Sequence, residues 1–321
     1  MLHSIIIPHR NRLPQLAACL ASINRSAEAT GIEDFEIVLV NHGVPEDAHG
    51  FTLAAMTPHL RIIMDTDPMP IFNKARLLNY GLKAARGDVI TFLDADAIVG
   101  ERWLEGAEVL VEPERLLDVD PELAAKWTAY GLELAELNLT RLCYRVRTLP
   151  RDFAHYPDHF GQPPAECIAT AFAFYPDHPR AYEAYITPDF SPPEGAKPDP
   201  VQHPVFGNSQ FSIPRGTLAA LADALPDAPR VVGHHGRPLL AYDPGYVGRG
   251  FQDIDYIQAI WHGMDDHLDG YRAVIFTDPE HAMFHVQHPY ADDWDPTVTR
   301  DGILHHTAKE ANAARYRQKW Q

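Results

Sequence analysis

The chain has 321 residues, of which 45% are hydrophobic, so it is long enough to bury a full core as one large domain or two moderate ones. Its 27 lysines and arginines stand against 44 aspartates and glutamates, which gives a formal net charge of −17. That charge opposes strong nonspecific binding to nucleic acid or to anionic membranes, so we expect neither as a partner. The three cysteines are scattered and form neither a disulfide framework nor a zinc-binding pattern.

We expect no signal peptide, because the first three residues run directly into a predicted strand. No apolar stretch of the sequence is long enough to span a bilayer. The sequence therefore predicts a cytoplasmic protein without a membrane span.

The first hundred residues alternate predicted strands and helices. Short apolar, β-branched runs predict strands at residues 4–7, 36–40, 60–64 and 89–93, and helical spacing predicts helices at residues 13–23 and 73–85. This alternation predicts an α/β fold with a mostly parallel central sheet that helices cover on both faces.

The alternation stops after residue 110. Residues 111–149 carry apolar side chains at spacings of three and four, which predicts a mainly helical segment. Residues 188–204 are rich in proline and are expected to form a loop. Helical patterns return at residues 254–262 and 307–320.

Two carboxylates, Asp94 and Asp96, follow the strand predicted at residues 89–93. In open α/β sheets, ligands bind outside the carboxyl ends of the strands. Strand alternation would turn both carboxylates to the same side, where they would suit a divalent cation and the phosphates that it carries. An ordinary acidic turn after a strand is the alternative that this motif alone leaves open.

Two further segments carry cations close to expected strand or helix ends. Arg10 and Arg12 follow the first strand, where arginines can clamp a phosphate or stack on a base. Lys74 and Arg76 begin a helix, where positive charge is unfavourable unless an anion lies nearby. Solvated surface charges are the alternative at both places.

Two later segments could complete a site. In the segment at residues 248–255, glycines are followed by Asp253 and Asp255, which could act on a ligand or could be plain helix N-terminal charges. His285 and His288 could supply imidazole ligands to a metal that Asp96 also binds. Because the chain has 18 histidines, solvated histidines are the alternative to this metal pair.

The order of these segments resembles the nucleotide-binding half of the β-1,4-galactosyltransferases and of the related chondroitin-polymerase and family-2 glycosyltransferases. The resemblance rests on Pro-His-Arg-Asn-Arg, Phe-Asn-Lys-Ala-Arg-Leu-Leu-Asn-Tyr-Gly, Asp-Ala-Asp and Gly-Arg-Gly-Phe-Gln-Asp-Ile-Asp, then on residues 285–288 and the pair at 306–307. It implies the GT-A fold, in which one nucleotide-binding sheet merges with an acceptor-binding half. Residues 1–110 would then be the nucleotide-binding half, residues 111–204 an acceptor-side insertion, and residues 205–321 the catalytic and acceptor half.

The resemblance also implies roles for individual residues. Asp253 would be the general base of an inverting transfer, and Asp96, His285 and His288 would bind Mn²⁺ or Mg²⁺. Gln252 stands where the family has Glu, Arg249 where it has Trp, and Asn41 where many relatives have an Asp that binds uracil. The residues that would line the site of the UDP-sugar donor are Pro8, Arg10, Arg12, Asn41, Phe72, Lys74, Asp94, Gly207, Gln252 and Asp255.

The sequence thus predicts a metal-dependent, inverting glycosyltransferase that moves a sugar from a UDP-sugar to the hydroxyl of a carbohydrate or glycoconjugate acceptor. A nucleotidyltransferase that uses an NTP and a sugar phosphate is one alternative, which the lack of a glycine-rich NTP loop near the N-terminus counts against. A catalytically inactive nucleotide-sugar-binding protein is the other, which the replacements at Asn41, Arg249 and Gln252 keep open.

Overall fold

The computed structural model describes most of the chain outside one long central segment and several short ones. The described residues are 1–10, 13–42, 57–66, 72–142, 145–146, 210–248, 251–267, 271–274, 276, 280–281, 283–285, 299–300 and 303–320. Arg12, Gly207, Arg249, His288 and the proline-rich stretch at 188–204 lie outside these ranges.

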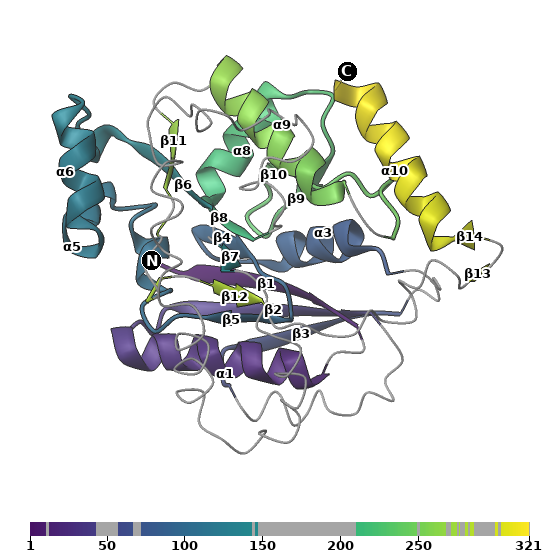
Figure 1. Cartoon of the computed structure of the whole chain (residues 1–321), viewed down its shortest axis with the longest axis horizontal. Helices are drawn as coiled ribbons and strands as arrows, with labels where there is room; N and C mark the ends of the chain where they lie inside the picture. Colours follow the sequence, from purple (N-terminus) through teal and green to yellow (C-terminus); the bar gives the residue numbers. More distant parts are fainter. Residues whose placement is uncertain are drawn as a thin grey trace.

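A seven-stranded sheet with the order β11-β6-β8-β4-β1-β2-β3 forms the centre of the molecule (Figure 1). The first four strands along the chain are parallel to one another, β11 is parallel to β6, and β8 runs antiparallel to both of its neighbours. The expected α/β class with a mostly parallel sheet is therefore confirmed. The strands of this sheet are β1 (His3–His9), β2 (Phe35–His42), β3 (Leu60–Asp65), β4 (Val89–Phe92), β6 (Asn138–Leu142), β8 (Phe211–Pro214) and β11 (Tyr271–Val274).

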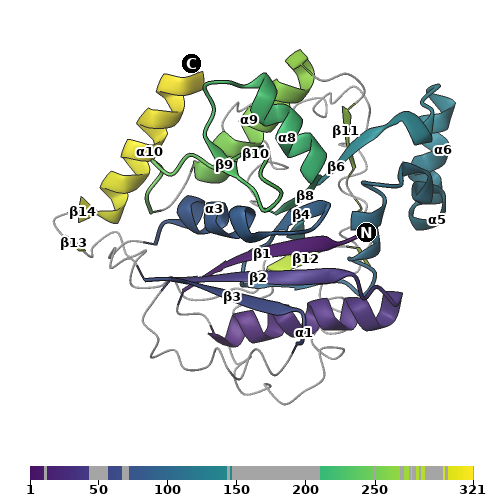
Figure 2. The same cartoon turned by 180° about the vertical axis from the view of Figure 1, so that it is seen from behind.

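Helices cover both faces of this sheet (Figures 1 and 2). Helix α1 (Leu13–Thr30) lies on one face, whereas α3 (Lys74–Ala84), α8 (Arg215–Ala224) and α9 (Gln252–His267) lie on the other. Helix α10 (His305–Trp320) lies on the opposite side of the molecule from α5 (Leu116–Val119) and α6 (Pro121–Ala129). None of the described helices has both the length and the apolar character that crossing a membrane requires.

The remaining described elements are short. They are β5 (Ala97–Val99), α4 (Glu105–Glu108), η1 (Pro113–Arg115), η2 (Leu134–Glu136), β7 (Arg145–Val146), β9 (Arg230–Val232), β10 (Pro238–Leu240), β12 (Met283–His285), β13 (Thr299–Arg300) and β14 (Ile303–Leu304). Strand β12 pairs with both β5 and β7 in a small three-stranded sheet.

The core has a separate layer on each face of the sheet. Because side chains alternate along a strand, Ile6 of β1 packs toward α3 and α8, whereas Ile5 and Ile7 pack toward α1. All three isoleucines are fully buried, as expected for a strand that helices cover on both faces. The two layers hold the central strands rigidly, which fixes where their carboxyl ends lie.

The segment at residues 111–149 differs from the prediction of a mainly helical structure. It contains helices α5 and α6, but residues Asn138–Leu142 form β6 of the main sheet. Leu134 and Leu137 have helical spacing, yet they lie in and just after the short turn η2 that leads into this strand. Pairing with β8 and β11 decides the conformation here, and this long-range pairing leaves no trace in the local spacing.

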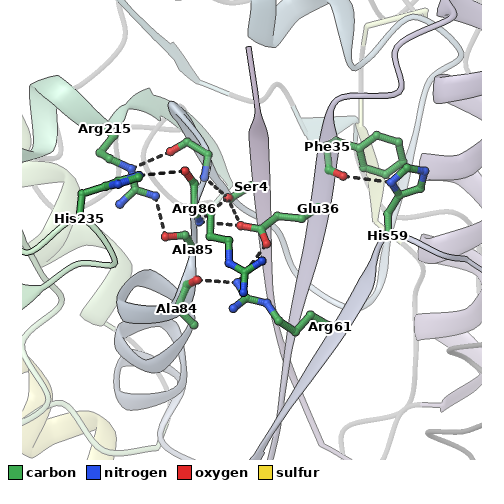
Figure 3. A network of polar contacts seen from close by, with 11 residues as sticks. Ser4, Phe35, Glu36, His59, Arg61, Ala84, Ala85, Arg86, Arg215 and His235 are labelled. Carbon is green, nitrogen blue, oxygen red and sulfur yellow. Dashed lines mark hydrogen bonds and ion pairs between the residues drawn. The ribbon is translucent and has the colours of Figure 1, made fainter.

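The connection between α3 and β4, residues 85–88, is held by side chains from the amino ends of other strands (Figure 3). The carboxylate of Glu36 accepts a hydrogen bond of 2.6 Å from the backbone N–H of Arg86. The hydroxyl of Ser4 accepts one of 2.7 Å from the N–H of Gly87 and donates one of 2.6 Å to Glu36. A Cβ at Gly87 would come within 2.6 Å of the backbone at Leu2 and Ser4, so this close approach requires glycine.

A second set of contacts to this connection comes from the α8 side (Figure 3). Arg215 donates hydrogen bonds of 2.8 Å and 2.7 Å to the carbonyl oxygens of Ala85 and Gly87. The Nε2 atom of His235 lies 3.2 Å from the carbonyl oxygen of Arg86. These contacts fix the amino end of β4, so the four-residue strand delivers its carboxyl end to a defined position.

We expect Gly81→Ala to lower the free energy of unfolding by about 1–3 kcal/mol, because it overpacks the contact between α3 and the sheet. A Cβ at Gly81 would meet the Cγ2 atom of Ile6 at 2.2 Å and that of Val40 at 3.3 Å. The matched control is Gly216→Ala in α8, where no atom lies within 4 Å of the added carbon. Urea denaturation of both variants measures the difference, and equal midpoints would contradict tight packing at Gly81.

Candidate functional site

Two carboxylates lie just beyond the carboxyl end of β4. The strand ends at Phe92, and the N–H of Ala97 donates a hydrogen bond of 3.1 Å to the carbonyl oxygen of Asp94. A turn therefore sets the positions of Asp94 and Asp96, so the prediction that strand alternation places them is wrong. The side chain of Asp94 is 27% exposed, whereas Asp96 is buried, so only Asp94 is open to the surface.

The ammonium group of Lys74 joins two of the predicted site residues. Its Nζ atom lies 2.6 Å from Oδ1 of Asp94 and 3.5 Å from Oδ2 of Asp253. On the other side of Asp94, Gln210 donates a hydrogen bond of 3.0 Å from Nε2 to Oδ2. Residues expected from sequence in both halves of the chain thus meet in one cluster beyond β4.

The charges in this cluster shift the pKa of each group. Burial raises the pKa of Asp253, and the nearby charge of Asp94 adds to the rise, while Lys74 offsets only part of it. Burial also opposes ionisation of Asp94, but Lys74 outweighs burial and lowers the pKa of that carboxyl. The pKa of Lys74 is raised, since Asp253 and Asp94 outweigh the effect of burial on the ammonium. Asp253 is therefore the more basic of the two carboxylates, which suits it to accept a proton.

The start of α3 explains how Lys74 is positioned. Asn73 caps the helix, because its Oδ1 atom accepts a hydrogen bond of 2.9 Å from the N–H of Arg76, and its Nδ2 donates one of 3.2 Å to the carbonyl oxygen of Pro244. The sequence indicated that Lys74 and Arg76, two cations at the start of this helix, need an anion nearby. Carboxylates of the chain itself provide it: Asp94 pairs with Lys74, and Asp65 accepts a hydrogen bond of 2.6 Å from Arg76.

Tyr242 and Asn79 belong to the cluster, although sequence reasoning did not find them. Asn79 of α3 makes two hydrogen bonds of 2.9 Å to the backbone N–H and carbonyl of Tyr242. Burial and the charge of Asp253 raise the pKa of the Tyr242 hydroxyl well above its usual range. A buried asparagine within a leucine-rich helix is a poor helix former, and that is the signal by which Asn79 could have been found.

Several buried polar atoms of this cluster and of Gln252, which precedes Asp253 in the sequence, have no hydrogen-bond partner within the described part of the chain. They are Oε1 of Gln210, the hydroxyl of Tyr242, Oε1 of Gln252 and Oδ1 of Asp253. Buried polar groups are almost always hydrogen-bonded in native proteins, so these atoms indicate a place for water or a ligand. Three of the four atoms can only accept, so the complementary group must donate hydrogen bonds.

Residues expected to bind the nucleotide lie at the carboxyl ends of β1 and β2. Pro8 is buried in β1, and the next residue, His9, is opposite Asn41 in the strand pairing. The Oδ1 atom of Asn41 lies 2.8 Å from Nδ1 of His9, so the oxygen that was expected to receive uracil is already paired. The ring of His42 stacks at 6.3 Å on that of Phe72, and this contact provides an aromatic surface beside these strand ends.

The structure brings together the backbones of two of the three predicted metal ligands. His285 of β12 lies opposite Ala97 of β5, one residue from Asp96. The third, His288, falls outside the described residues, and the part of the chain that the structure describes contains no cluster of three or more metal-binding side chains. Since Lys74 and Gln210 already engage Asp94, Asp96 is the better suited of the two carboxylates to a cation. One carboxylate with imidazoles is a donor set that fits Mn²⁺.

Asp255 points away from the cluster, in contrast to its expected role in donor binding. Its carboxylate accepts hydrogen bonds of 2.9 Å from Lys319, 2.8 Å from Trp320 and 3.1 Å from Tyr246. Asp255 is buried and belongs to a contact between α9 and α10. We therefore assign it no contact with the donor.

Comparison with known proteins gives matches to glycosyltransferases. Residues 4–112 match the family described as glycosyl transferase family 2. The uncharacterized glycosyltransferase EpsJ of Bacillus subtilis (strain 168) is 34% identical over 111 residues, which are 33% of this chain and 30% of that protein. The aligned segment thus spans less than a third of this curated relative. The match confirms the resemblance to family-2 glycosyltransferases and the GT-A fold class that the sequence predicted.

Solved structures with low sequence identity are also similar to this chain. S. aureus TarS in complex with UDP-GlcNAc gives a TM-score of 0.48 at 11% identity and covers 93% of this chain and 62% of that chain. Glucosyl-3-phosphoglycerate synthase from Mycobacterium tuberculosis, in complex with Mg²⁺ and UDP, gives a TM-score of 0.41 at 13% identity and covers 98% of this chain and 79% of that chain.

We expect Lys74→Met to lower the free energy of unfolding by about 2–4 kcal/mol at neutral pH, because it leaves two partly buried carboxylates without their cation. Without Lys74, the pKa of both Asp94 and Asp253 rises, so each carboxyl takes up a proton more readily as the pH falls. The loss relative to the unaltered protein should therefore shrink between neutral pH and about pH 5. Urea denaturation across this range measures it.

The matched control for this prediction is Lys83→Met, which removes an exposed lysine from the last turn of the same helix. We expect it to change stability by less than about 0.5 kcal/mol at any pH in the range. A loss in Lys74→Met that did not depend on pH would contradict the electrostatic account of the cluster.

Proposed function

We propose that this chain, whose residues 4–112 match glycosyltransferase family 2, is a metal-dependent, inverting glycosyltransferase. It would move a sugar from a UDP-sugar to the hydroxyl of a carbohydrate or glycoconjugate acceptor. The observation that carries the proposal is the contact of Lys74 with Asp94 and Asp253. This contact links the family-matched segment directly to a partly buried carboxylate, Asp253, whose pKa is raised by burial.

Asp253 is the proposed general base. As the acceptor oxygen attacks the anomeric carbon, its proton passes to the carboxylate of Asp253, a new carbon–oxygen bond forms, and the bond to UDP breaks on the opposite face. One displacement of this kind inverts the configuration at that carbon. The raised pKa of Asp253 strengthens it as a base, while the charge of Lys74 offsets part of the effect of burial and favours the ionised form.

A divalent metal fits the donor side of the proposed site. When bound, it supplies positive charge for the diphosphate that departs. Asp96 would hold it together with His285 and His288. The residues that we still predict to contact the donor are Pro8, Arg10, Arg12, Phe72 and Gly207.

The buried atoms that need hydrogen-bond donors favour a sugar in this site over the nucleotidyl transfer that the sequence left open. Oε1 of Gln210, Oε1 of Gln252 and Oδ1 of Asp253 can only accept hydrogen bonds. Sugar hydroxyls can donate to them, whereas the oxygens of an attacking phosphate would be repelled. We therefore place the sugar, and not the phosphates, against Gln210, Tyr242 and Asp253.

We expect UDP with Mn²⁺ to raise the thermal stability of the protein, and EDTA to abolish the shift. A ligand that binds only the folded state stabilises it by about 2.7 kcal/mol at a hundredfold excess over its dissociation constant. Asp96→Asn should lose the Mn²⁺-dependent part of the shift, because it removes a charged ligand of the metal. The matched control is Asp88→Asn, which alters an exposed carboxylate just before the amino end of β4. This variant should keep the Mn²⁺-dependent shift.

The panel of nucleotides should also include GDP, CDP and dTDP. A metal-dependent shift with one of these in place of UDP would contradict the proposed donor while leaving the enzyme class standing. No shift with any of the nucleotides would contradict the proposed function.

We expect Asp253→Asn to lower kcat for UDP release from a UDP-sugar by about 10²–10⁴-fold, because the amide cannot accept the proton. The stability shift with UDP and Mn²⁺ should stay, since donor binding does not need the base. In the unaltered protein, kcat should rise with pH through the raised pKa of Asp253. Asp227→Asn, on an exposed loop, is the control, and full activity of Asp253→Asn would contradict the assignment.

A further inference from the structure

We infer that helix α10 positions the proposed catalytic base, an inference that rests on the proposed function. The residues that do so lie far from the family-matched segment in the sequence, at residues 312–320. They contact the segment at residues 243–255, which ends with the first turn of α9 and carries Asp253. In Figures 1 and 2, α10 lies beside the loops that lead into α9.

The first contact is a two-pronged ion pair at the start of this segment. Arg315 of α10 donates from Nε and Nη2 to the two carboxylate oxygens of Asp243, at 2.8 Å and 3.0 Å. Burial opposes ionisation of Asp243, but the hydrogen bonds from Arg315 and the N–H of Gly245 outweigh it and lower the pKa. Paired hydrogen bonds of this kind fix orientation as well as distance.

The second contact lies at the end of the segment, two residues after the proposed base. Both carboxylate oxygens of Asp255 are engaged, by Lys319 and Trp320 of α10 and by Tyr246. The ring of Trp320 also stacks on His262 of α9 at 4.9 Å, with 6° between the ring planes. Because Asp255 is buried, removing its partners would leave a charge without compensation in the first turn of α9.

Between these ends, α10 also holds the backbone of the segment. Asn312 donates a hydrogen bond of 2.9 Å to the carbonyl oxygen of Val247 and accepts one of 3.4 Å from its N–H. Tyr316 packs against the ring of Phe251 at 5.5 Å. Phe251 has a backbone φ of +69°, a value that residues other than glycine rarely adopt. Its conformation therefore depends on surrounding contacts such as the one with Tyr316.

These five residues of α10 form one face of the helix. Asn312, Arg315, Tyr316, Lys319 and Trp320 follow the spacing of three and four that brings side chains together on a helix. Helix α3 also contacts this segment, through the hydrogen bond of Asn73 to Pro244 and the ion pair of Lys74 with Asp253. The proposed base is thus fixed between two helices, of which only α3 belongs to the family-matched segment.

The test uses two variants of the full chain that remove single contacts to Asp255. Trp320→Phe keeps a ring that can stack on His262 but loses the N–H that bonds Asp255, and Lys319→Met removes the cation. Arg317→Met, on the exposed side of α10, is the matched control. Misplacement of a catalytic group by about 1 Å can cost about 10²-fold, so we expect kcat to fall about 10- to 100-fold in both variants. The KM for the UDP-sugar and the affinity for UDP with Mn²⁺ should stay unchanged.

Gly245→Ala disturbs the ion pair between Arg315 and Asp243 without a substitution in α10 or at Asp255. A Cβ at Gly245 would lie 2.5–2.9 Å from the guanidinium of Arg315, so the side chain of Arg315 must move. This variant should show the same fall in kcat at constant KM. Unchanged kcat in all three variants would overturn the inference. A parallel loss of kcat and of UDP affinity would overturn it as well, since that result indicates general unfolding.

Hydrogen exchange separates this inference from the proposed function. Loss of the α10 contacts should speed amide exchange in residues 251–255 by about tenfold, with no change in β1, β2 and β4. If the unaltered protein released no UDP from any UDP-sugar while exchange responded in this way, the proposed function would fail and the positioning role of α10 would stand. Unchanged exchange in residues 251–255 would overturn that role whatever the activity.

Discussion

The cation of Lys74 lies between two partly buried carboxylates that the chain supplies from segments more than 150 residues apart. Each group would be unfavourable in this position without the other two, because a buried charge needs a partner. Lys74 is the first residue of α3, and Asn79 of the same helix holds the backbone of Tyr242. Helix α3 therefore sets the distance between the family-matched segment, residues 4–112, and the segment that carries Asp253. The other contacts of the site follow from the placement of this helix.

The sequence predicted those parts of the molecule that depend on local pattern. The apolar run of β4 and the two acids after it indicated a site at the end of a sheet, and Lys74 and Asp253 were both found by their place in ordered motifs. The structure brings these residues together. The strand order and the family match agree with the α/β class that the alternation of elements predicted.

Features that depend on contacts between distant segments could not be predicted in this way. Strand β6 forms because β8 and β11 pair with it, although its local spacing suggested a helix. The turn that closes at Ala97, and not strand alternation, sets the positions of Asp94 and Asp96. Asp255 was grouped with Asp253 because the two are close in the sequence. Side chains two residues apart on a helix point in different directions, however, and Asp255 faces α10. Gln210 and Tyr242 carry no motif that distinguishes them from ordinary core residues.

The position of α10 along the chain has a consequence for the time at which the site becomes complete. A ribosome adds residues 305–320 after every other described part of the site, and chains acquire structure from the N-terminal side during synthesis. The strands of the sheet and helix α3 are therefore available while Asp243 and Asp255 still lack Arg315 and Lys319. On this arrangement, the growing chain forms the sheet and α3 first, and the first turn of α9 is fixed in place only when α10 has docked. Under the proposed function, a partly made chain that lacked α10 would hold a donor without being able to use it.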